Sequence, residues 1–109
     1  MTETEYRALI QETFDRISRA FDDVDPDQAE CERIPGSMTI TLADGSRCIL
    51  SSQPSVRQLW LALAAKGTAV HFNWDASREQ WWDDKGKGIE LKSFLSRYFQ
   101  EVLGQELAL

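Results

Sequence analysis

The first 24 residues carry apolar side chains at three- and four-residue steps, which is the spacing of an amphipathic α-helix. These positions are Tyr6, Leu9, Ile10, Phe14, Ile17, Phe21 and Val24. At about 100° per residue they gather on one side of a helix, and the acidic residues of the same segment fall on another side. Pro26 cannot extend the helical hydrogen bonds and disfavours helical geometry in the residue before it. The pattern therefore predicts one helix that buries one side and continues up to Pro26.

Beyond Pro26 the apolar period changes to two, which is typical of β-strands with one buried face. The segments with this period span residues 29–34, 38–42, 47–52, 58–63, 70–74 and 80–83. Pro35-Gly36 and Asp44-Gly45 interrupt them as turns, and Asp-Gly is a strong hairpin signal. Residues 89–103 return to helical spacing, with Gly104 as the expected stop.

The order of a helix, a run of strands and a second helix predicts an α+β fold. We expect a two-layer α-β sandwich, in which the N- and C-terminal helices pack on one face of an antiparallel sheet of five to six strands. The opposite face of such a sheet is open to solvent. The chain has 109 residues and contains no linker, repeat or low-complexity segment, so we expect a single domain over residues 1–109.

Charge is distributed unevenly along the chain. The whole protein has a net charge of -6 and a sequence pI of about 4.7. Residues 1–32 hold ten acidic and three basic side chains, a net charge of -7, whereas the other 77 residues hold eight acidic and nine basic ones, a net charge of +1. This balance disfavours binding to phosphate backbones, so we expect no nucleic-acid partner. A cation or a basic protein surface is the natural complement of the first third of the chain.

Membrane, zinc and enzyme signals are missing from the sequence. No stretch approaches the roughly 18 apolar residues of a membrane span, and the N-terminal segment is acidic where a signal peptide is basic. We therefore expect a cytoplasmic protein without a membrane partner. Cys31, Cys48 and the single His71 cannot supply four zinc ligands, and we expect both thiols to be reduced. Neither a GxSxG nor a P-loop motif is present, and nothing indicates an enzyme active site.

One run of acidic residues continues from the first helix into the first strand without an intervening base. Its members are Asp22, Asp23, Asp25, Asp27, Glu30 and Glu32. Such a run can be a solvated surface that keeps the protein soluble. Its density, however, costs stability through self-repulsion, which indicates a function. Carboxylates suit hard cations, and because the spacing is not that of an EF-hand we expect weak, salt-sensitive binding. The same field would attract a basic partner protein.

The aromatic residues are divided by strand alternation. If the leucines of residues 58–63 face the helices, Trp60 lies on the open sheet face beside Gln58. Trp60 then either lies flat on its own sheet or serves as a recognition anchor, because exposed tryptophan is enriched at interface hot spots. We expect the other three tryptophans in the core or at its rim: Trp74, Trp81 and Trp82. We expect His71 on the sheet surface rather than in a metal site.

Several segments resemble the frataxin family in its bacterial, CyaY-type form. In chain order they are Glu5-Tyr6, Asp22-Asp-Val-Asp25, Cys31-Glu32, Met38-Thr-Ile-Thr-Leu42, Gln53-Pro54, Gln58-Leu-Trp-Leu61, Val70-His-Phe72, Trp81 and the closing helix. The resemblance covers essentially the whole chain. The most specific part is the combination of the Q-P-x-x-x-Q-L-W-L stretch with an acidic N-terminal helix.

The resemblance implies an iron-binding protein of iron-sulfur cluster assembly, which acts as a regulator or an iron donor. It implies weak binding of Fe²⁺ and Fe³⁺ by an acidic ridge and association with the cysteine desulfurase and the iron-sulfur scaffold protein. Carried onto this chain, the acidic ridge is Glu12, Asp15, Asp22, Asp23, Asp25, Asp27, Glu30 and Glu32. The contact on the sheet face centres on Trp60 with Gln58. Ser18 and Arg19 stand where related sequences carry acids, so we expect a mid-ridge metal position to be weak or absent.

Two alternatives stay open at this point. The chain can be a purely protein-protein regulatory module whose metal binding is incidental. It can also have a weak ferroxidase activity, which we do not expect, because exposed carboxylates without a preformed open site are poor catalysts. We expect a monomer, and whether iron drives the formation of oligomers stays open.

Overall fold

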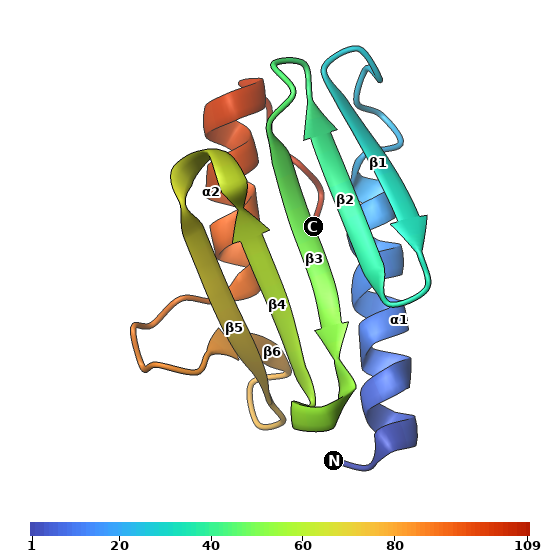
Figure 1. The fold of residues 1–109 in the computed structure, drawn as a ribbon, viewed down its shortest axis with the longest axis vertical. Helices are drawn as coiled ribbons and strands as arrows, with labels where there is room; N and C mark the ends of the chain where they lie inside the picture. Colours follow the sequence, from blue (N-terminus) through green and yellow to red (C-terminus); the bar gives the residue numbers. More distant parts are fainter.

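The computed structural model describes residues 1–109 and contains two helices and six strands. The helices are α1 (Glu3–Ala20) and α2 (Leu91–Leu103), and the strands are β1 (Ala29–Ile34), β2 (Ser37–Leu42), β3 (Arg47–Gln53), β4 (Gln58–Leu63), β5 (Thr68–Asp75) and β6 (Gln80–Asp83). Two short 3₁₀ turns, η1 (Pro54–Val56) and η2 (Ala64–Lys66), follow β3 and β4. The strands are neighbours in chain order, and every pair is antiparallel. Both helices lie on one face of the sheet (Figure 1), which confirms the expected α+β sandwich.

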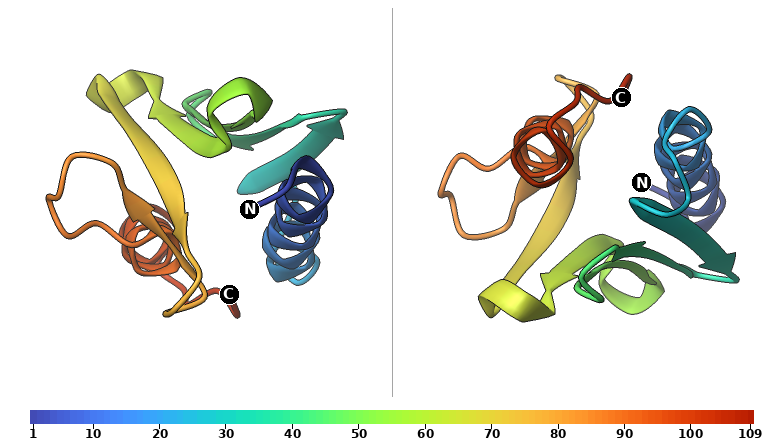
Figure 2. Two further views of the ribbon diagram at one scale, coloured as in Figure 1. Left: turned by 90° about the horizontal axis from the view of Figure 1, so that it is seen from below. Right: turned by 90° about the horizontal axis from the view of Figure 1, so that it is seen from above.

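The core lies between the sheet and the two helices, which lie on the same side of the cyan and green strands when the molecule is viewed from either end (Figure 2). Because successive side chains of a strand face opposite sides, every second strand residue enters this space. Met38, Ile40, Leu50, Leu59 and Phe72 have no exposed surface. The helices contribute the residues that their periodicity predicts: Tyr6, Ile10, Phe14 and Ile17 from α1, and Leu91, Leu95, Tyr98 and Phe99 from α2. Neither helix has the length and hydropathy that crossing a membrane requires.

The first helix ends earlier than Pro26 predicts. α1 stops at Ala20, and tight turns over residues 21–28 lead into β1. Phe21 and Val24 are still buried, and the ring of Phe21 packs edge-on against Phe99 with centroids 5.1 Å apart. The prediction of a continuous helix up to Pro26 is therefore wrong. The chain has to reverse direction so that β1 can run back alongside α1, and the turns satisfy the same apolar spacing that a helix would.

The second helix begins with a glutamate cap. The carboxylate of Glu90 accepts hydrogen bonds from the backbone N–H of Lys92 at 2.7 Å and of Ser93 at 3.1 Å. These are two of the N–H groups that a helix start leaves without a partner, and the negative charge lies at the positive end of the helix dipole. Both effects offset the burial of Glu90, which is only 8% exposed. The helical spacing from residue 89 does not single out Glu90, because glutamate is not among the preferred N-cap residues.

Asp83 orders the loop between β6 and α2. Its carboxylate accepts hydrogen bonds from the backbone N–H of Lys87 and of Ile89, each at 2.8 Å. These bonds hold the pKa of Asp83 below its ordinary value. Because the folded pKa lies below the unfolded one, the stabilisation is fully present above about pH 4, the ordinary value for aspartate. It is lost as the pH falls through the folded pKa.

We expect Asp83→Asn to lower the free energy of unfolding at neutral pH and to reduce its decline on acidification. The amide carries no charge and does not titrate, so the contribution that Asp83 loses in acid is already missing in the variant. Urea unfolding at a series of pH values measures this. Glu79→Gln is the control, because it removes the same charge from the preceding turn, where Glu79 makes no hydrogen bond or ion pair. An identical pH dependence in wild type and Asp83→Asn would contradict the expectation.

Candidate functional site

The residues of the acidic ridge are distributed over three parts of the fold. Glu12 and Asp15 lie on α1, and Glu30 and Glu32 lie on β1. The other four, which we call the turn aspartates, lie between these elements: Asp22, Asp23, Asp25 and Asp27. The turn aspartates and both β1 glutamates are exposed, and none of these six side chains forms an ion pair. They form an uncompensated negative surface.

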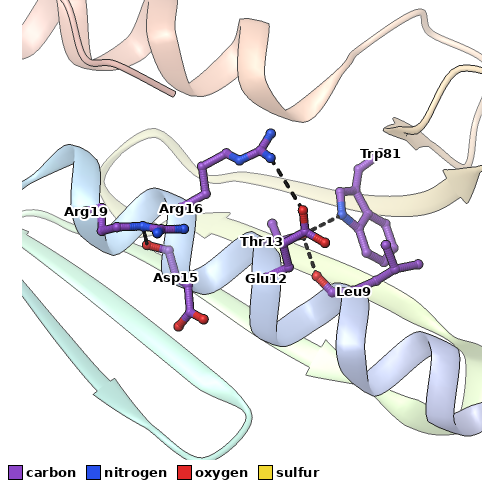
Figure 3. Close-up of polar contacts among 7 residues, drawn as sticks. All are labelled: Leu9, Glu12, Thr13, Asp15, Arg16, Arg19 and Trp81. Carbon is purple, nitrogen blue, oxygen red and sulfur yellow. Dashed lines mark hydrogen bonds and ion pairs between the residues drawn. The ribbon is translucent and has the colours of Figure 1, made fainter.

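The two ridge residues on α1 already have arginine partners. Asp15 accepts a hydrogen bond from Arg33 of β1 at 2.6 Å, and this bond holds the pKa of Asp15 below its ordinary value. Glu12 is paired with Arg16, one helical turn further on, at 3.4 Å (Figure 3). A metal ion at either carboxylate would compete with an arginine. The structure therefore separates these two residues from the unpaired part of the ridge.

Asp25 has a role in the turn itself. Its Oδ1 accepts a hydrogen bond from the backbone N–H of Asp27 at 2.9 Å, which is a local turn that aspartate favours. One oxygen of Asp25 is thereby engaged. The side chains of Asp22, Asp23 and Asp27 make no hydrogen bond within the protein, so their oxygens are available to a ligand.

The structure does not assemble a preformed metal cage. No group of three or more His, Cys, Asp or Glu side chains is placed so that it could hold one metal ion. Cys31 beside the ridge is half-buried, and burial raises the pKa of its thiol, which disfavours the thiolate that metals require. What the ridge offers is a row of separate oxygen donors. Such a row suits hard cations that keep most of their water ligands, and its negative charge is the electrostatic complement of a basic surface.

A second candidate surface lies on the open face of the sheet, where the sequence predicts Trp60. The leucines of β4 are buried, so Trp60 projects from the opposite side of the strand. Its Nε1–H donates to Gln58 Oε1 at 2.8 Å. Its ring stacks on His71 of β5, with centroids 4.0 Å and planes 9° apart. Trp60 thus lies flat on its own sheet in a fixed orientation, with its ring half-buried.

Gln58 connects this ring to two residues that the sequence patterns do not single out. Its Nε2–H donates to Asn73 Oδ1 at 3.1 Å and to Asp84 Oδ2 at 3.2 Å, and the same Asp84 oxygen lies 3.7 Å from Nδ1 of His71. We call the set of Gln58, Trp60, His71, Asn73 and Asp84 the tryptophan platform. Strand register could have found Asn73, which lies opposite Gln58. Asp84 lies in the loop after β6, and no local sequence signal places it here.

Trp81 is a core residue, as expected, and it ties β6 to α1. Its Nε1–H donates to the hydroxyl of Thr13 at 3.0 Å, and this hydroxyl donates to the carbonyl of Leu9 at 2.7 Å (Figure 3). Trp74 packs edge-on against Trp81 with ring centroids 5.3 Å apart. The polar group of Trp81 is therefore satisfied inside the protein and is not available for binding.

Comparisons with known proteins give sequence relatives and a structural neighbour. A family model described as a frataxin-like domain matches residues 1–105. A protein named iron-sulfur cluster assembly protein CyaY from Pseudomonas fluorescens (strain Pf0-1) is 33% identical over 106 residues, which cover 97% of this chain and 93% of the relative. The protein of the same name from Azotobacter vinelandii is 34% identical over 107 residues, covering 98% and 94%. A solved structure of a frataxin from Psychromonas ingrahamii has a TM-score of 0.85 at 19% identity, covering 98% of this chain and 96% of that one.

The two kinds of likeness support different conclusions. At 19% identity the solved structure shows that the fold is shared. The family model and the sequence relatives span nearly the whole chain, so they show membership of a family and not only a shared fold. On these grounds, the chain belongs to the frataxin-like family.

Proposed function

We propose that this protein takes part in iron-sulfur cluster assembly as a binding protein without an active site of its own. In this role it binds Fe²⁺ and Fe³⁺ weakly along the acidic ridge and docks through the same surface on a cysteine desulfurase. The name shared by the sequence relatives supports the pathway. The single observation that carries the proposal is the unpaired negative surface formed by the turn aspartates and the two β1 glutamates.

The chemistry of the ridge supports iron as a cargo that is held loosely. All its donors are carboxylate oxygens, which match the hardness of Fe³⁺ and accept Fe²⁺. The donors do not converge on one point, so a bound ion keeps water ligands and exchanges readily. A protein that passes iron on, or whose docking responds to iron, requires this kind of binding.

A purely protein-protein regulatory module is the second candidate, and one observation favours it. Asp15 of the ridge already accepts a hydrogen bond from Arg33 at 2.6 Å, so one carboxylate of this surface is paired with a guanidinium group. A partner with arginines on its surface could use the turn aspartates in the same way. In this case partner binding is the same with and without iron.

We further propose that the tryptophan platform forms a second contact, to the iron-sulfur scaffold protein. The network of hydrogen bonds around Gln58 holds Trp60 in place before binding, so little side-chain entropy is lost on docking. The turn aspartates lie between α1 and β1, whereas the tryptophan platform lies on β4, β5 and the loop after β6. One protein could therefore contact two partners at the same time.

Anaerobic titration with Fe²⁺, followed by NMR, tests the iron-binding proposal. We expect the signals of residues 22–27 to broaden or shift first, while those of α2 stay unchanged. In a variant carrying Asp22→Asn and Asp23→Asn the same effects should require more iron. Uniform perturbation of the whole chain, or an unchanged response in the variant, would contradict a site on the turn aspartates.

We also expect divalent cations to raise the melting temperature. A ligand that binds only the folded state stabilises it by mass action, and a bound cation relieves repulsion among the turn aspartates. For a domain of this size about 1 kcal/mol corresponds to roughly 4–8 °C. Differential scanning calorimetry with Mn²⁺, and with NaCl at equal ionic strength as the control, measures the effect. The rise should shrink in the Asp22→Asn, Asp23→Asn variant and remain in Glu101→Gln, and no Mn²⁺-specific rise would speak against cation binding.

A further inference from the structure

The two edge strands of the sheet, β6 and β1, differ in whether another segment of the chain covers them. At the β6 edge the polypeptide returns to cover the strand, since Trp82 forms a bridge with Glu90 and the N–H of Asp83 donates to the carbonyl of Ile89 at 2.9 Å. At the other edge, β1 pairs along its whole length with β2 and with nothing on its outer side. An uncovered edge strand is a template for pairing with another chain.

The register shows which backbone groups of β1 point outward. In an antiparallel pair, hydrogen-bonded and non-hydrogen-bonded residues alternate. The N–H of Ala43 donates to the carbonyl of Gln28 at 3.0 Å, which makes this a hydrogen-bonded pair. Counting along the register, the peptide groups of Glu30 and Glu32 also face β2. Those of Cys31 and Arg33 therefore point away from the sheet, and none of the turn, loop or cap hydrogen bonds involves them.

The open side of this free edge is acidic, and on its helix side one carboxylate lies near Arg33 and another near Cys31. On the open face the exposed carboxylates of Glu30 and Glu32 flank the outward-pointing groups. On the helix face, Asp15 reaches Arg33 at 2.6 Å, and Asp22 is close enough to Cys31 to add to the effect of burial, which raises the pKa of the Cys31 thiol. A strand placed beside β1 would have the two unpaired glutamates along its open side and, on the helix side, Asp22 and the Asp15–Arg33 pair.

We propose that the β1 edge binds an extended, lysine- or arginine-bearing segment of a partner protein as an added antiparallel strand. Its backbone pairs with the outward N–H and C=O groups of Cys31 and Arg33. Its basic side chains, at every second position, lie opposite Glu30 and Glu32. These are non-hydrogen-bonded positions toward the new strand, where facing side chains approach most closely. Pairing with β1 of a second copy would bring glutamates against glutamates, so the charge favours a basic partner.

This inference deepens the docking function proposed above and rests on it for the existence of a basic partner. It requires new backbone hydrogen bonds, which diffuse attraction to the ridge does not require. Diffuse attraction involves side chains only and leaves the backbone as it is. Strand addition forms hydrogen bonds at Cys31 and Arg33 and leaves those of Glu30 and Glu32, which already belong to the sheet, unchanged.

The test is an NMR titration of the full chain with a short capped peptide in which lysine alternates with valine or threonine. We expect the amides of Cys31 and Arg33 to shift and to gain protection from hydrogen exchange, while those of Glu30 and Glu32 keep the protection they have. N-methylation of the valine and threonine residues, whose N–H groups face β1, should weaken binding at least about tenfold. N-methylation of the same number of lysines, whose N–H groups point away, is the matched control and should weaken it much less.

A variant carrying Glu30→Gln and Glu32→Gln separates the charge from the backbone contribution. We expect it to bind the unmethylated peptide about three- to tenfold more weakly, with the same alternating protection. Equal effects of the two methylated peptides, or no protection at Cys31 and Arg33 at millimolar peptide, would overturn strand addition. If the peptide fails but a cysteine desulfurase still binds through the turn aspartates, only this inference falls. If that binding is also absent, the proposed docking function falls with it.

Discussion

Replacing Asp22, Asp23 and Asp27 together by asparagine is expected to weaken binding to a cysteine desulfurase by about ten- to a hundredfold at low salt. These three turn aspartates are exposed and make neither an ion pair nor a side-chain hydrogen bond within the protein. Their charge is therefore free to act on a partner. Asp25 is left unchanged, because its carboxylate holds the turn through the N–H of Asp27. The substitution removes charge while preserving the local structure.

A matched control separates the position of the charge from its total. Glu79→Gln, Glu101→Gln and Glu106→Gln remove the same number of charges from exposed sites outside the ridge. We expect this control to bind almost as the wild type does. Calorimetric titration at two salt concentrations measures both variants, and the difference between them should shrink at high salt, where exposed charges are screened.

Other outcomes of this experiment would relocate the contact. Equal weakening in both variants would mean that only net charge matters and would contradict docking on the turn aspartates. Unchanged binding in the aspartate variant, with loss in Trp60→Ala, would move the desulfurase contact to the tryptophan platform. Repeating the titration with Fe²⁺ separates the two candidate functions, because an incidental metal leaves the affinity unchanged.

The second large effect is expected at Tyr6, which joins α1 to the two strand ends on either side of η1. The Tyr6 side chain is 1% exposed. Its hydroxyl donates to the carbonyl of Gln58 at 2.6 Å and accepts from the N–H of Gln53 at 2.9 Å. One hydroxyl thus satisfies the backbone on both sides of η1 and links the end of β3 to the start of β4.

Two substitutions at Tyr6 separate its ring from its hydroxyl. Tyr6→Ala should lower the free energy of unfolding by about 3–5 kcal/mol, since it leaves a cavity in the core. Tyr6→Phe should lower it by about 1–3 kcal/mol, because it leaves a backbone donor and acceptor without their partner. Tyr98→Phe is the control, since the Tyr98 hydroxyl joins no pair of backbone groups. Urea unfolding measures all three, and a loss in Tyr6→Phe no larger than in Tyr98→Phe would contradict the bridging role.

Periodicity was sufficient to predict the layers of this fold. Alternation over residues 58–63 buries the leucines and leaves Trp60 on the open face, as the structure shows. The Asp44-Gly45 hairpin and the end of the last helix at Gly104 were also predicted, because each depends on local backbone preference. Local rules are reliable at these places because the turn and the helix end each need a backbone conformation that glycine adopts readily.

Local rules failed where distant parts of the chain determine the end of an element or the partner of a side chain. α1 ends at Ala20 because the chain must turn back to form β1, and nothing near Pro26 encodes that requirement. Two ridge residues that look alike in sequence also differ in space. Asp15 meets Arg33, 18 positions away, whereas Asp22 meets no base. The ion pair exists only because α1 and β1 lie side by side.

The sequence by itself determined the number and kind of layers, the single core, the excess of negative charge in the first 32 residues and the face on which Trp60 lies. These properties follow from residue periodicity and composition, which act over a few neighbouring residues. The tertiary structure alone decided which carboxylates are paired, that Asp84 and His71 complete the tryptophan platform, and that β1 is the uncovered edge. These depend on contacts between segments far apart in the chain. Such contacts depend on how the elements pack against one another, and no local pattern in the sequence specifies that packing.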